Sequence, residues 1–221
     1  TSRGLGDVYK RQDTWFKGLD RVYNNFVYDY LYPNPASVLA FIENHDTDRF
    51  LGEGENLDML KQASTLLLTT RRIPQLYYGT EVMMNGVKSK SDGYVRKDFP
   101  GGWADDKENA LTPEGRTRLQ NESYNFYRNL LNWRKGNDVI AKGSMKQFMV
   151  QHGVYAYARQ YKGKTVFVLL NGTDKEVKLP LKYYAEVLKD KTQGKDVISG
   201  KVTALNEELT MAPRQSMVIE L

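Results

Sequence analysis

Cysteine is absent from this sequence of 221 residues, and that absence excludes several kinds of chemistry at once. The chain can form no disulfide, can offer no thiolate ligand to zinc and has no thiol nucleophile. Histidine is scarce as well, with 2 residues. One of them, His152, precedes a glycine and has no cluster of other ligand residues around it, so we predict no metal site.

Long apolar runs are also absent. The longest ones, at residues 65–70 and 166–170, are far shorter than the roughly 20 residues that a helix needs to cross a bilayer. We therefore predict no membrane span in this chain.

Charge of one sign does not dominate, because 32 basic residues face 27 acidic ones and the two kinds alternate along the chain. The net charge of +5 implies only a mild attraction to anions. A surface that follows nucleic-acid phosphates needs lysine and arginine gathered on one face. We find no such block with interleaved aromatic residues, and predict that nucleic acid is not a partner.

The first residues look foreign to the rest of the sequence. The segment from Asp7 to Gln12, DVYKRQ, resembles the translation of a transposon-derived sequencing adapter. We therefore interpret residues 1–12 as a non-native segment and leave them out of the fold prediction. An ordinary basic terminus is the alternative.

Residues 13–137 alternate between helical and strand patterns. Apolar residues at three- and four-residue spacing predict helices, the first of which ends at Pro33. Short apolar runs that end in polar residues predict buried strands. The expected order is helix 14–32, strand 37–42, helix 57–72 capped by Asn56, strand 73–79, a glycine-rich loop and helix 113–135.

This order is typical of the last part of a (β/α)8 TIM barrel. Three helices and two strands cannot close a barrel, which normally needs about 250 residues. We therefore expect residues 13–137 to be the C-terminal part of the barrel, with its N-terminal part missing from this chain.

Residues 138–221 show the shorter period of β-strands, broken by glycine, asparagine and aspartate turns. The clearest hairpin signal is the turn at Lys162-Gly163-Lys164 beside the apolar run VFVLL. We predict a second, antiparallel β-sandwich domain, so that the whole chain is α/β plus all-β. Its expected strands are residues 145–150, 154–161, 164–171, 176–180, 184–188 and 215–221.

Two polar clusters follow the two predicted barrel strands, Glu43 to Asp46 and Thr80-Glu81. Catalytic groups of a barrel lie at the C-terminal ends of its strands, so both clusters should face one mouth. A carboxylate beside an imidazole suits sugar recognition, because it accepts from vicinal hydroxyls while histidine can donate or accept. A hydrogen-bonded turn without a functional role is the alternative.

Three segments in this order resemble the α-amylase family of glycoside hydrolases. FIENHDTDRF at residues 41–50 is similar to the family's signature on its seventh strand, and IPQLYYGTEV at 73–82 is similar to its eighth strand. RKDFPGGW at 96–103, followed by LTPEGR and LLNWRKGNDVI, resembles the neopullulanase and cyclomaltodextrinase group.

The resemblance implies a retaining mechanism on α-1,4-linked, and as an extension α-1,6-linked, glucans or maltooligosaccharides. Asp46 then matches the carboxylate that stabilises the transition state, His45 binds the same sugar and Asn44 positions the turn. The nucleophile and the general acid belong to the family's fourth and fifth strands, which this sequence does not contain. The resemblance gives those two roles to none of Glu43, Glu81 and Asp98, so we expect no hydrolysis by this chain alone.

Four further residues are candidates for substrate contact. Arg49 could reach substrate or form a structural salt bridge, and Arg96 and Asp98 could contact sugars or brace their loop. Trp103 could stack on a glucose ring or pack within the loop.

The remaining expectations concern partners and rival functions. A noncatalytic carbohydrate-binding barrel protein and a transglycosylase of the same family stay open as alternatives. We expect no cofactor in this segment. For the full-length protein, calcium binding and a homodimer stay open. Its location is left open, with the periplasm or the extracellular space as the favoured places.

Overall fold

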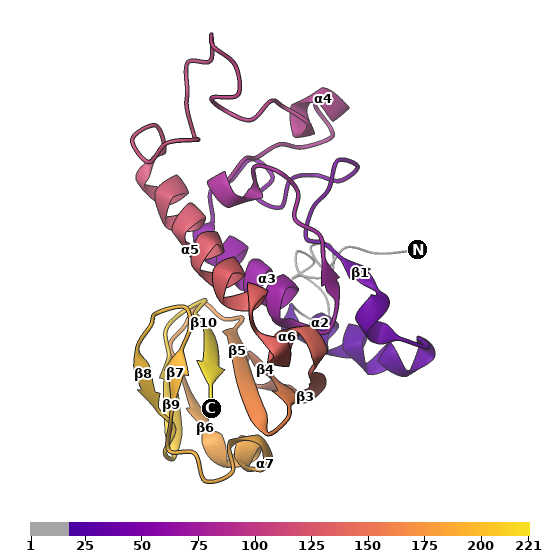
Figure 1. Cartoon of the computed structure of the whole chain (residues 1–221), viewed down its shortest axis with the longest axis vertical. Coiled ribbons are helices and arrows are strands. Elements are labelled where there is room, and N and C mark those ends of the chain that lie inside the picture. Colours follow the sequence, from indigo (N-terminus) through magenta and orange to yellow (C-terminus); the bar gives the residue numbers. More distant parts are fainter. Residues whose placement is uncertain (1–17) are drawn as a thin grey trace.

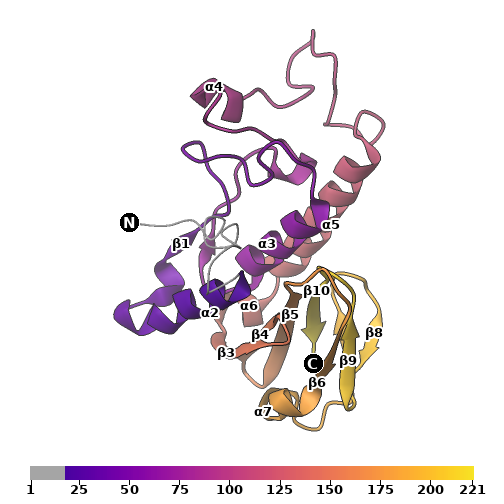
Figure 2. The ribbon, with the colours of Figure 1, turned by 180° about the vertical axis from the view of Figure 1, so that it is seen from behind.

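The computed structural model describes residues 18–221. The adapter-like segment 1–12 and the first residues of the predicted helix 14–32 lie outside that range. Figure 1 shows a helical part, with α3 (Leu57–Thr69) and α5 (Arg118–Lys135) side by side, above a β-rich part that holds the C-terminus. The view from behind in Figure 2 shows the same two parts, with α4 (Asp92–Val95) at the end away from the sheets.

The first described helix is α2 (Leu19–Val27), which continues as the 3-10 helix η1 (Tyr28–Leu31). Leu19, Val22 and Phe26 are buried, at the three- and four-residue spacing that predicted an amphipathic helix here. The side chain of Asn34 then accepts a hydrogen bond from the Ala36 N–H and caps η2 (Pro35–Ser37).

Two short strands follow, β1 (Leu39–Ala40) and β2 (Ile73–Pro74), which pair in parallel. The predicted strands 37–42 and 73–79 were too long. Pro74 has no N–H to donate, and the ladder closes with the Gln75 N–H donating to the Ala40 carbonyl at 2.8 Å. Two paired strands of two residues each do not form a barrel within residues 18–221, so the TIM barrel stays a prediction.

The long helices are α3 (Leu57–Thr69) and α5 (Arg118–Lys135). The Asn56 side chain caps α3 as predicted, but that helix ends three residues earlier than expected. The start predicted for α5, at residue 113, was also wrong. Thr117 and Gln120 form a reciprocal capping box, which sets the first turn of a helix where it occurs.

Shorter helices connect these elements. They are η3 (Thr80–Val82), α4 (Asp92–Val95) within the predicted glycine-rich loop, and α6 (Asp138–Lys142), which Asn137 caps.

Residues 144–220 form two antiparallel sheets. The larger one has the strand order β3-β4-β5-β10-β7-β8 and the smaller one pairs β6 with β9. The predicted hairpin turn lies between β4 and β5, but it holds two residues, Lys162 and Gly163, both with positive φ, because Lys164 already pairs with Tyr161. The strands are β3 (Ser144–Gln151), β4 (Val154–Tyr161), β5 (Lys164–Asn171), β6 (Val177–Pro180), β7 (Gln193–Asp196), β8 (Val202–Ala204), β9 (Glu208–Met211) and β10 (Ser216–Glu220).

One predicted strand, residues 184–188, is helical instead. The chain forms η4 (Leu181–Tyr184) and α7 (Ala185–Leu188) there. Leu181, Tyr184, Val187 and Leu188 are all buried. Their spacing of three and four residues places them on one face of a helix, and it was mistaken for the pattern of a strand.

The six-stranded sheet is covered on both faces. One face packs against the small sheet and α7 through residues such as Phe167, Leu179 and Met211. The other face packs against α2, α3 and α5 through residues such as Tyr157 and Val168. The β-rich part and the helical part therefore share a continuous apolar core.

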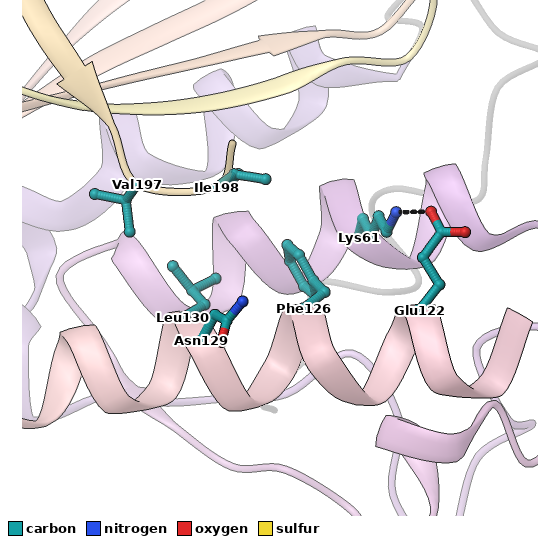
Figure 3. A pocket seen from close by; sticks show the side chains of 7 residues that line it. All are labelled: Lys61, Glu122, Phe126, Asn129, Leu130, Val197 and Ile198. Carbon is teal, nitrogen blue, oxygen red and sulfur yellow. Dashed lines mark hydrogen bonds and ion pairs between the residues drawn. The ribbon is translucent and has the colours of Figure 1, made fainter. Parts of the chain in front are cut away.

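A small cavity of about 190 Å³ lies at this junction. Figure 3 shows that Phe126 and Leu130 of α5 approach it from one side and Val197 and Ile198, after β7, from another. An ion pair of 2.5 Å between Lys61 and Glu122 stands at its end.

Candidate functional site

The segments that follow β1 and β2 lie against each other. The Thr80 hydroxyl, after β2, donates to the carboxylate of Glu43, after β1. The Arg49 guanidinium donates to the Tyr78 carbonyl at 2.6 Å. The polar clusters that the sequence placed at two strand ends thus meet in the structure.

A tight turn presents His45 and Asp46. The Asn44 side-chain oxygen accepts from the Asp46 N–H at 2.9 Å, and the Thr47 hydroxyl accepts from the Asn44 N–H at 3.1 Å. The backbone N–H groups of Asn44 and Asp46 thus find acceptors within the turn, which asparagine and threonine side chains commonly provide. The side chains of His45 and Asp46 remain 59% and 63% exposed, with His45 Nε2 3.2 Å from Asp46 Oδ2.

The loop after β2 reaches over this turn. Arg96 lies 3.2 Å from Asp46 Oδ1 and donates to the His45 carbonyl at 3.0 Å. Lys88 donates to the Asp46 carbonyl at 3.1 Å. The carboxylate of Asp92 forms ion pairs with both cations, at 3.2 Å from Arg96 and 3.3 Å from Lys88. A network of mixed charge therefore holds the imidazole and carboxylate pair against the loop.

Arg49 occupies a different place from the other predicted contacts, because its side chain is fully buried. Its guanidinium lies 4.1 Å from the ring centre of Tyr77 and 4.8 Å from that of Tyr78, and it pairs with Glu43 at 3.2 Å. This position matches the salt-bridge alternative better than contact with a sugar at the surface.

Asp98 and Trp103 lie further along the same loop and are exposed, Trp103 to 64%. The Asp106 carboxylate fixes the backbone here, accepting from the N–H groups of Trp103 and Gly101 at 3.1 and 2.8 Å. The indole thus stands on a braced turn with its ring open to solvent.

Glu81, in η3, is partly buried beside the Glu43 and Arg49 pair. Burial raises its pKa, while hydrogen bonds from the backbone of Glu81 and Gly79 and the charge of Arg49 act in the opposite direction. A raised pKa is common among functional carboxyl groups, and also among structural ones.

Sequence reasoning missed Lys88 and Asp92 as members of this network. Both lie in the polar loop after β2, where charged residues are too frequent for any one of them to stand out. Only the contacts with Arg96 and Asp46 distinguish them.

Within residues 18–221, no group of three or more histidine, cysteine, aspartate or glutamate side chains is arranged to hold a metal ion. In the same range, no helix combines the length and apolar character that crossing a membrane requires.

The chain is similar in sequence to α-amylases and related enzymes. Residues 145–220 match the family described as the cyclo-malto-dextrinase C-terminal domain. An α-amylase from Niallia circulans is 27% identical over 213 residues, which cover 93% of this chain and 37% of that protein. A cyclomaltodextrin glucanotransferase from Thermoanaerobacterium thermosulfurigenes is 30% identical over 170 residues, covering 77% of this chain and 21% of the relative. The chain therefore spans well under half the length of either relative.

Solved structures show the same fold. The α-amylase of Geobacillus thermoleovorans, determined with acarbose, superposes with a TM-score of 0.75 at 20% identity, over 98% of this chain and 45% of its own. A cyclomaltodextrin glucanotransferase with a three-domain ABC arrangement gives 0.71 at 24% identity, over 98% and 42%. The antiparallel sheets with their helices match the C-terminal domain of these structures.

Proposed function

The chain belongs to the α-amylase family, and from this premise we propose that it is the C-terminal part of a glycoside hydrolase acting on α-1,4-linked glucans or maltooligosaccharides. The observation that carries the proposal is the turn of His45 and Asp46, exposed after β1 and braced by the loop that follows β2.

The chemistry of this turn suits a sugar. A carboxylate accepts hydrogen bonds from neighbouring hydroxyls, and an imidazole can donate or accept. Such bonds accelerate hydrolysis only where they strengthen as the ring distorts toward an oxocarbenium-like transition state. We assign that part to Asp46, with His45 binding the same ring and Arg96 holding the carboxylate in place.

We further propose that the chain does not hydrolyse glucans by itself. Retaining hydrolysis needs two carboxyl groups about 5 Å apart on either side of the scissile bond. Glu43 is buried and bonded on both oxygens, and Asp92 is bridged by two cations. The family resemblance also gives neither role to Glu81 or Asp98, so we assign the nucleophile and the acid to other parts of a complete barrel.

The exposed apolar residues of β1 and β2 support a larger barrel around them. Leu39 is 46% exposed and Ile73 is 49% exposed. Parallel sheets are normally covered on both faces, and this pair leaves one large apolar side chain of each strand open. Further parallel strands and helices packed on them would remove that exposure.

The experiment compares the full-length protein, recovered from its source, with residues 18–221 alone on maltotriose and on longer maltooligosaccharides. We expect hydrolysis by the full-length protein only, and a fall of at least about a hundredfold in kcat for Asp46→Asn. The control variant Asp174→Asn removes an exposed carboxylate of the β-rich part and should leave kcat unchanged.

Glucanotransferases among the relatives make transfer the second reaction to measure. Products longer than maltotriose would identify transglycosylation by the same site. A full-length protein that binds maltooligosaccharides without cleaving or transferring them would contradict the enzyme proposal and favour a noncatalytic binding protein.

A further inference from the structure

Glu43 is a buried carboxylate whose charge is compensated by neighbouring groups. Its carboxylate is buried, and its partner Arg49 is completely so. Burying an ionised group is unfavourable unless charge and hydrogen bonds compensate for the lost water. The partners of Glu43 therefore show what this buried charge connects.

The carboxylate joins three points of the chain. Oε1 accepts from the Thr80 hydroxyl and lies 3.2 Å from the Arg49 guanidinium, while Oε2 accepts from the Phe50 N–H. Phe50 follows the turn that carries His45 and Asp46, so the bond to its N–H closes the base of that turn. The bond from Thr80 fastens the same base to the segment after β2.

Arg49 extends the connection to the overlying loop. Its Nε donates to the Val95 carbonyl at 3.0 Å, next to Arg96. Its own backbone N–H donates to the Gly86 carbonyl at 2.9 Å. One buried ion pair thus contacts the turn, the segment after β2 and both ends of the loop segment that lies over Asp46.

We infer that Glu43 is a positioning residue, whose buried carboxylate fixes the His45 and Asp46 turn relative to the segment after β2. The inference rests on the proposed function for what the turn does, but the geometry of the clamp stands by itself. Glu43 does not touch substrate, because both its oxygens are engaged inside the protein.

Two variants of the full-length protein test this role. Glu43→Gln removes the charge and leaves Arg49 without its carboxylate. Thr80→Val removes one donor with little change of shape, and leaves the ion pair in place. Thr80→Ser restores the hydroxyl and serves as the rescue variant.

Asp29→Asn is the matched control. Asp29 is also a buried carboxylate paired with arginines, Arg71 at 2.8 Å and Arg72. It lies in η1, and its partners are outside the candidate site. Loss of its charge should lower the thermal midpoint without moving the turn.

We expect Glu43→Gln and Thr80→Val to lower kcat on maltotriose by about tenfold or more, because small displacements of a reacting group have large effects on rate. KM should change less than kcat, since the sugar contacts outside the turn remain. Thr80→Ser should recover the wild-type kcat, and Asp29→Asn should keep it. Wild-type kcat in both Glu43→Gln and Thr80→Val would overturn the inference, as would equal losses in Asp29→Asn.

Hydrogen exchange separates this inference from the proposed function. If the wild-type protein shows no activity on glucans, the proposed function fails, yet exchange of the amides from His45 to Phe50 still reports the clamp. Faster exchange in Glu43→Gln and Thr80→Val, but not in Asp29→Asn, supports the positioning role. Unchanged exchange in the first two variants contradicts it.

Discussion

Arg159, on β4 of the six-stranded sheet, donates to the carbonyl of Thr69, the last residue of α3, at 2.8 Å. The same guanidinium donates to the carbonyls of Ile140 and Gly143 at 2.9 and 2.8 Å. The last carbonyls of a helix lack partners within the helix. A side chain of β4 therefore supplies hydrogen-bond donors to the C-terminal carbonyls of two helices, α3 and α6.

This relationship predicts a large effect of removing the guanidinium. Burial lowers the pKa of Arg159 to about 10, so the group is still charged near neutral pH. Arg159→Met should reduce the free energy of unfolding by about 3 kcal/mol or more, since several buried carbonyls lose their donor. Urea unfolding measures the difference. The control Arg128→Met, on the exposed side of α5, should change it by less than about 0.5 kcal/mol. A loss below that of the control would contradict the account.

Glu81 should make stability fall as pH rises. Burial raises its pKa above the ordinary value of 4.5. From that value upward the folded state holds its proton more firmly than the unfolded state, so the free energy of unfolding decreases with increasing pH until the folded group ionises. Glu81→Gln removes this decrease. Urea unfolding between pH 4 and 7 should show a smaller fall with pH for the variant, and equal slopes would refute the assignment.

The ion pair between Lys61 and Glu122 should make the free energy of unfolding rise with pH, the opposite of the effect of Glu81. Its hydrogen bond lowers the pKa of Glu122, so its contribution to stability is present above the ordinary pKa and is lost as pH falls through the folded value. Glu122 is 45% exposed, and exposed pairs contribute less than about 1 kcal/mol. A double-mutant cycle with Lys61→Met and Glu122→Gln should give a small coupling that disappears in 1 M salt. A coupling that persists in salt would show that the cavity beside the pair shields it.

The hairpin turn between β4 and β5 predicts unequal effects of two glycine substitutions. Gly163 has a φ of +79°, whereas the Cβ of an alanine at Gly136 would meet nothing within 4 Å and φ there is −106°. Gly163→Ala should cost about 1 kcal/mol because of the left-handed backbone. Gly136→Ala should be close to neutral. Thermal unfolding of the two variants side by side decides the matter, and equal midpoints would contradict the turn geometry.

Local signals in the sequence predicted much of the fold. The cap at Asn56 located the start of α3, and the Lys162-Gly163 pair located the hairpin, because both depend on neighbouring residues only. The start of α5 was missed although Thr117 and Gln120 carry a capping-box pattern, since Pro113 suggested an earlier first turn. Strands β7, β8 and β9 were missed because they are short and carry few apolar residues.

The candidate site was predictable in part. Strand-end logic placed Asp46 and Thr80 at a common edge, and the structure brings their segments together through Glu43. The burial of Arg49 depends on the rings of Tyr77 and Tyr78, nearly 30 residues away along the chain. A single sequence does not show which arginine such rings will enclose, so the same residue was open to both a substrate and a structural interpretation.

A structure of the full-length protein with maltotriose tests the central claim most directly. The account predicts that His45 and Asp46 both hydrogen-bond hydroxyls of a single glucose ring, within the ordinary 2.5–3.2 Å range, beneath the loop that carries Arg96. A sugar bound elsewhere, with both side chains facing only solvent and Arg96, would contradict it.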